Sequence, residues 1–181
     1  TEHQPSASER FASVWTGTHL LVFGMRDGGL FDPCTNRWTP ASIRGMPIEI
    51  PDLGSELPIQ PVVVGRHIVW LFPPSEEFLS PSSAKVSAMI FDTRGNTWSA
   101  VPRTGAAPNP GLSSAIVVAG SELLYWGVGQ AGGCARLDPQ TNTWRPISTR
   151  SAPFARPRLR AAWTGTQVFV WNGDRGSLYD P

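Results

Sequence analysis

The chain has little of what most reactive sites are made from. Its 181 residues include two cysteines and three histidines, and no Gly-x-Ser-x-Gly elbow, His-Glu-x-x-His motif or phosphate-binding loop occurs. We therefore predict no catalytic residues and no cofactor. Whether the protein is an enzyme stays open at this point, with a non-catalytic role favoured.

Long apolar runs and strong charge are missing as well. No stretch of about 18 apolar residues is present, so we expect no membrane-spanning segment. The formal net charge is +1, which gives no reason to expect a nucleic-acid partner. Two cysteines neither require nor exclude an oxidising compartment. The cellular location is left open, with an extracytoplasmic or secreted one favoured.

Glycine, proline and tryptophan are abundant instead, at 18, 18 and 8 residues. Glycine and proline both interrupt helices. Spread among short apolar runs, they indicate turns between strands. We expect an all-β chain whose length suits one domain.

An internal repeat organises the chain. Each copy begins with a glycine turn, continues with an apolar run, and reaches an aromatic residue or leucine followed by Asp. The turn glycines, separated by 48, 55 and 45 residues, are Gly17, Gly65, Gly120 and Gly165. The aspartates are Asp32, Asp92, Asp138 and Asp180. In three copies a tryptophan stands six residues after the Asp, namely Trp38, Trp98 and Trp144.

The run after each turn glycine is apolar at nearly every position, which is typical of a strand covered on both faces. Sheets stacked around an axis cover both faces of such strands. We predict a β-propeller with four blades of four-stranded antiparallel sheet, the last one incomplete. The blades are expected at residues 10–42, 60–102, 112–149 and 158–181.

The apolar run, the aromatic residue before Asp and the later Trp, as in Phe31-Asp32 and Trp38, resemble the Kelch motif. The period is close to the about 50 residues of Kelch repeats. Where Kelch blades usually carry a Gly-Gly doublet, this chain has pairs such as Gly24-Met25. The resemblance, to propellers like the central domain of galactose oxidase, implies about six or seven blades. This chain would then be a segment, completed by absent sequence or by another chain.

The loops at one end of the predicted blades vary in length. From the turn glycine to the Asp, blade 2 is 12 residues longer than blade 1. Variable loops on a rigid scaffold are where binding residues usually lie. We predict a surface for a protein or glycan ligand there, formed by Arg26, Asp27, Glu76, Glu77, Phe78, Arg156, Arg158, Asp174 and Arg175.

Other recurring residues have structural explanations. We expect the aspartates to accept hydrogen bonds in turns and the tryptophans to pack between blades. His19, His67 and Glu122 hold equivalent positions in three repeats, but facing sheets lie about 10 Å apart, so no metal site is predicted. Cys34 and Cys134 fall two blades apart, beyond the roughly 7 Å that a disulfide allows between Cα atoms, so we expect no bond between them.

The residues therefore favour a non-catalytic binding or scaffolding module that uses the variable loops. The alternative is a fragment of a carbohydrate-active propeller enzyme, of the sugar-oxidase or sialic-acid-epimerase type. In that case the catalytic groups would lie in blades outside this chain. The positions of Tyr125 and Tyr179 do not match the tyrosine and histidine copper site of galactose-oxidase-like enzymes.

Overall fold

The computed structural model describes residues 2–6, 11–24, 27–43, 45, 61–72, 85–108, 114–127, 133–148, 150 and 159–181. This part of the chain contains fifteen β-strands and no α-helix, as the composition predicts. Across these ranges no helix is long and apolar enough to cross a membrane.

The strands form four sheets, which we call blades 1 to 4 in chain order. Blade 1 consists of β1 (Phe11–Trp15), β2 (Leu20–Gly24), β3 (Gly28–Asp32) and β4 (Arg37–Ala41). Blade 2 consists of β5 (Val62–Val64), β6 (His67–Leu71), β7 (Val86–Asp92) and β8 (Thr97–Pro102). Blade 3 consists of β9 (Ala115–Ala119), β10 (Glu122–Trp126), β11 (Cys134–Asp138) and β12 (Thr143–Pro146). Blade 4 consists of β13 (Arg160–Trp163), β14 (Val168–Trp171) and β15 (Gly176–Tyr179).

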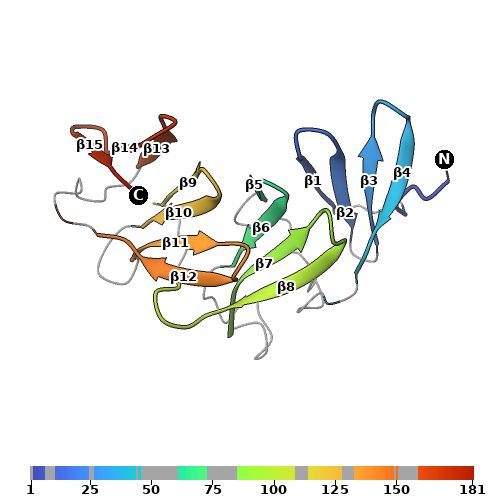
Figure 1. Cartoon of the computed structure of the whole chain (residues 1–181), viewed down its shortest axis with the longest axis horizontal. Helices are drawn as coiled ribbons and strands as arrows, with labels where there is room; N and C mark the ends of the chain where they lie inside the picture. Colours follow the sequence, from blue (N-terminus) through green and yellow to red (C-terminus); the bar gives the residue numbers. More distant parts are fainter. Residues whose placement is uncertain are drawn as a thin grey trace.

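Each strand pairs antiparallel with the next strand in the chain, so every blade is a simple meander. The first strands of neighbouring blades, β1, β5, β9 and β13, lie beside one another, and the later strands extend away from them (Figure 1). The blades form an open arc with blades 1 and 4 at its two ends (Figure 1). The predicted propeller-like all-β fold is confirmed, including the incomplete fourth blade.

The turn between the third and fourth strands is built the same way in blades 1 to 3. The recurring Asp accepts a hydrogen bond from the backbone N–H two residues later, at 2.8, 3.0 and 2.8 Å for Asp32, Asp92 and Asp138. An asparagine follows with a positive φ of 55, 50 and 54°, a conformation that asparagine tolerates better than most residues. These asparagines are Asn36, Asn96 and Asn142. The structural role predicted for these three aspartates is confirmed.

Apolar side chains are buried between neighbouring blades, in three separate clusters. Strand β6 is buried at all of its positions because blades 1 and 3 cover its two faces. Strand β14 alternates between buried and exposed because only blade 3 lies against it. The continuous apolar pattern of a second strand is therefore realised fully where a blade has two neighbours.

Hydrogen bonds fix each blade against the one before it. The indole N–H of Trp98 donates to the carbonyl of Ser42 at 2.7 Å. The Asn96 side chain donates to the Pro40 carbonyl at 3.1 Å and accepts from the N–H of Ser42 at 2.7 Å. All of these bonds join blade 2 to the end of the fourth strand of blade 1.

Blade 3 uses the same two positions. The Trp144 indole N–H donates to the hydroxyl of Ser87 at 2.9 Å, and the Ser99 hydroxyl donates to Asn142 at 3.2 Å. Trp98 and Trp144 are buried, as expected of residues that pack between blades. Trp38, at the same position of blade 1, is only half-buried, because none of the other described blades covers its face of blade 1.

We predict that Asn96→Ala destabilises the protein more than Asn36→Ala. Both changes place alanine in the left-handed region, at a cost of roughly 1 kcal/mol. Asn96→Ala also removes two hydrogen bonds to blade 1, at a further cost of about 1 to 3 kcal/mol. Within the described residues the Asn36 side chain makes no hydrogen bond to another blade, so it is the matched control. Equal losses in urea unfolding would show that the interblade bonds contribute nothing.

Candidate functional site

Three of the nine residues predicted to form a binding surface can be placed. These are Asp27, Asp174 and Arg175, and each stands between the second and third strands of its blade. The other six, Arg26, Glu76, Glu77, Phe78, Arg156 and Arg158, lie outside the described residues. Asp174 and Arg175 are neighbours in blade 4, whereas Asp27 belongs to blade 1 at the other end of the arc (Figure 1).

Asp174 and Arg175 occupy the tip of a tight hairpin between β14 and β15. The backbone N–H of Asn172 donates to the Arg175 carbonyl at 3.1 Å. The Asn172 side chain is buried, and its oxygen accepts from the N–H groups of Asp174 and Arg175 at 3.0 and 2.9 Å. This turn holds the backbone firmly and leaves both charged residues exposed.

Asp27 holds the N-terminal segment in place. Its carboxylate accepts hydrogen bonds from the backbone N–H of Ser6 at 3.1 and 3.0 Å, and a further one from the Ser6 hydroxyl. Next to Ser6, Pro5 lies over Gly29 of β3, where a Cβ atom would come within 2.8 Å of the Pro5 ring. Glycine at position 29 therefore makes room for this segment.

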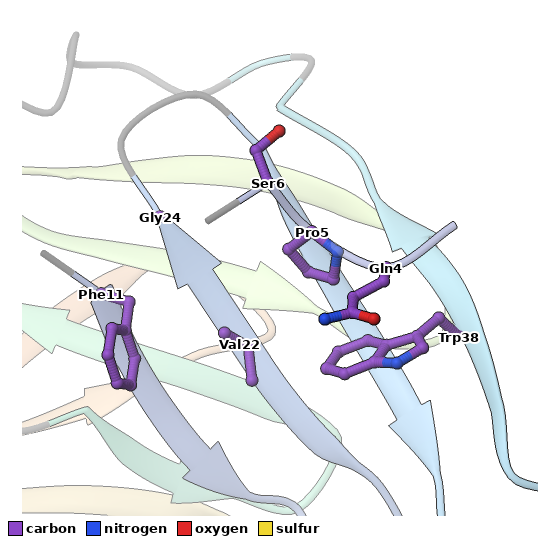
Figure 2. A pocket seen from close by; sticks show the side chains of 7 residues that line it. All are labelled: Gln4, Pro5, Ser6, Phe11, Val22, Gly24 and Trp38. Carbon is purple, nitrogen blue, oxygen red and sulfur yellow. The ribbon is translucent and has the colours of Figure 1, made fainter. Parts of the chain in front are cut away.

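A hollow of about 220 Å³ lies beside the N-terminal segment, on the face of blade 1 turned away from blade 2. Its lining residues are Gln4, Pro5, Ser6, Phe11, Val22, Gly24 and Trp38. Figure 2 shows Gln4 and Pro5 lying over the indole ring of Trp38, with Phe11 and Val22 on the neighbouring strands β1 and β2. The lining is mainly apolar and aromatic, so the hollow suits an apolar or planar group.

The sequence pattern does not indicate this hollow. It predicts packing between blades for Trp38 and no role for the first residues of the chain. In blades 2 and 3 the equivalent tryptophans bond to the preceding blade, whereas Trp38 has the N-terminal segment beside it. The fold-back of Pro5 has no counterpart in the other repeats, so the repeat gave no signal for it.

The three equivalent residues His19, His67 and Glu122 have separate surroundings. His19 Nδ1 lies 2.9 Å from the Thr18 hydroxyl, and Glu122 forms an ion pair with Arg136 at 3.4 Å. His67 is buried in blade 2. Among the described residues, no group of three or more His, Cys, Asp and Glu side chains is arranged to hold a metal ion.

The two cysteines are both free, so the bond between them that was expected to be absent does not form. Cys34 is exposed in the β3–β4 turn of blade 1, and Cys134 is half-buried at the start of β11 in blade 3. Blade 2 lies between them. Burial raises the pKa of the Cys134 thiol, so this side chain is less reactive than an ordinary cysteine.

No family model and no curated protein matches the chain. Among solved structures it is similar to one titled "Structure of YjhT", with 16% sequence identity, a TM-score of 0.45 and 90% of this chain covered. The chain spans 58% of the length of that structure. No ligand is inferred from this likeness.

We predict that His67 makes the protein less stable in mild acid. Burial lowers the pKa of His67, against the opposing influence of Asp92 and with a smaller lowering by Arg66. The folded state therefore disfavours the protonated imidazole, so stability is fully present above the ordinary pKa of about 6.5 and is lost as the pH falls below it. The thermal midpoint of the wild type should drop between about pH 7 and pH 5.

His67→Gln should flatten this pH dependence, even if it lowers the midpoint at both pH values. His19→Gln, at the equivalent position of blade 1, is the control and should keep the wild-type dependence because the buried imidazole is still present. A steep dependence that survives in His67→Gln would assign the effect to other groups.

Proposed function

We propose that this chain is a Kelch-like propeller segment that acts as a non-catalytic binding or scaffolding module. Its ligand, a protein or a glycan, is bound by the loops between second and third strands and between blades. Two kinds of observation support this proposal. One is that the turns at the other end of the sheets, between third and fourth strands, use their polar groups within the fold. The other is the exposed hairpin of blade 4.

The polar residues in the turns between third and fourth strands already form hydrogen bonds within the fold. The carboxylates of Asp32, Asp92 and Asp138 accept backbone hydrogen bonds in their own turns. The side chains of Asn96 and Asn142 are bonded to a preceding blade. Groups satisfied in this way cannot change partners without loss of stability. This end of the sheets is therefore poorly suited to variable recognition.

The exposed pair Asp174 and Arg175 is the observation that carries the proposal. Asp174 and Arg175 are consecutive and exposed, and the two residue types supply a carboxylate acceptor and a fork of guanidinium donors. Such a pair matches the amide groups of a peptide or the hydroxyl groups of a glycan. Because Asn172 already holds the backbone of the hairpin, little backbone entropy is lost when a ligand binds there.

We predict that Asp174→Ala with Arg175→Ala weakens ligand binding while changing the free energy of unfolding by about 0.5 kcal/mol or less, because both side chains are exposed. Labelled protein applied to glycan and peptide arrays identifies the ligand, and titration then measures its affinity. Arg94→Ala, an exposed charge in the β7–β8 turn, is the control and should bind normally. Normal binding by the double variant together with lost binding by Arg94→Ala would place the site on the other end of the sheets.

A further inference from the structure

At each end of the arc, one sheet face is not covered by another of the described blades. On blade 1, Phe11 and Trp15 have exposed fractions of 64% and 52%. On blade 4, the corresponding fractions are 38% for Phe169, 40% for Trp171 and 59% for Leu178. Exposed aromatic and aliphatic side chains in such density mark interaction surfaces. We call these two surfaces the blade-1 face and the blade-4 face.

Strand register shows which residues of the two faces correspond to residues buried elsewhere. Leu20 pairs with Trp15 and Phe31, just as Val168 pairs with Trp163 and Tyr179. Phe169, Trp171 and Leu178 therefore occupy the positions that Leu21, Phe23 and Leu30 occupy in blade 1. Those three residues of blade 1 are at most 9% exposed, because they pack on blade 2.

The aromatic contact between blades 1 and 2 shows what kind of side chain could pack on the blade-1 face. Phe23 packs edge-on against Trp98, with ring centroids 4.9 Å apart, and it also contacts Phe91 at 6.2 Å. Phe91 and Trp98 are themselves 5.1 Å apart, with an interplanar angle of 44°. On the blade-1 face, the equivalent pair Phe31 and Trp38 is also 5.1 Å apart, at 42°. The same pair is thus already formed on the blade-1 face, where Gln4 and Pro5 lie over the Trp38 ring (Figure 2).

The side chains of the two faces also differ in size from their counterparts in other blades. Those of the blade-1 face are smaller, and those of the blade-4 face are larger. Where blade 2 has Trp70, Phe72 and Met89, the blade-1 face has Val22, Gly24 and Gly29 at the equivalent register positions. The smaller residues border the hollow of about 220 Å³, and Pro5 fills the space over Gly29 (Figure 2). A cavity of about 150 Å³ holds a benzene ring, so this one has room for a larger ring.

The blade-4 face carries correspondingly larger residues. Phe169 stands at the position of Leu21, and Trp171 stands at the position of Phe23. Both rings lie close to Gly176, where a Cβ atom would meet the Phe169 ring at 2.6 Å and the Trp171 ring at 3.1 Å. The bulk missing from one face is present on the other. Within one chain the two faces lie at opposite ends of the arc (Figure 1).

We propose that two copies of this chain assemble head to tail, with the blade-4 face of each copy packed on the blade-1 face of the other. In this arrangement Trp171 enters the hollow beside Trp38 of the second copy. Two such contacts join the open arcs of the two copies into one ring. The contact is heterologous, and its closure into a ring prevents further growth.

The full chain should therefore sediment with twice the mass of one 19.6 kDa chain in analytical ultracentrifugation. Trp171→Arg alters the blade-4 face and Trp15→Arg alters the blade-1 face. Each should weaken self-association by roughly 30-fold or more, as expected for aromatic residues at the centre of an interface. Ile43→Arg is the matched control, because Ile43 is 55% exposed but belongs to neither face. Circular dichroism shows that each variant remains folded.

Mixing the two face variants tests the head-to-tail geometry. A mixed pair has one intact contact, between the blade-1 face of Trp171→Arg and the blade-4 face of Trp15→Arg, so the mixture should associate more strongly than either variant alone. A wild-type chain that stays monomeric at micromolar concentrations overturns the proposal. A dimer that Trp171→Arg leaves intact also overturns it, because the blade-4 face would then not take part. Neither result bears on ligand binding by the loops, which the array measurements test separately.

Discussion

Face-to-face stacking of sheets is the interaction on which this structure depends. No blade contains a core of its own, because a single sheet has no interior, and the three buried clusters all lie between blades. The free energy of burial is therefore gained by pairs of neighbours, as in other repeat proteins. Blade 2 has two neighbours and buries every residue of β6, whereas blades 1 and 4 have one neighbour each. Their open faces are the direct consequence.

Burial alone does not set the position of one blade on the next, because apolar contact has no preferred direction. The asparagine and tryptophan of the fourth strand supply that direction. The positive φ of Asn96 turns the chain into the last strand, and its side chain and the Trp98 indole then bond to Pro40 and Ser42 of blade 1. The conformation that makes the turn also places the groups that fix the neighbouring blade.

Much of this architecture was predictable because the same structural residues recur in each copy of the repeat. The turn glycines, the structural aspartates such as Asp92, and the packing role of Trp98 all follow from local chemistry and spacing. The N-terminal fold-back was not predictable, because it occurs once and depends on a contact between Ser6 and Asp27, 21 residues apart. The same contact changes how Asp27 is understood, since a residue predicted for ligand binding already has a partner inside the chain.

Stacking faces and sheet ends are separate surfaces in this fold, so their residues can change independently. The hairpin that carries Asp174 and Arg175 lies outside the three buried clusters, so changes at its tip leave the stacking of blades intact. Asp27 is different. By accepting hydrogen bonds from Ser6 it keeps Pro5 over Gly29, and Pro5 is part of the wall of the hollow on the blade-1 face. A substitution of Asp27 would therefore also affect the blade-1 face, whereas the same substitution of Asp174 would not affect a stacking face.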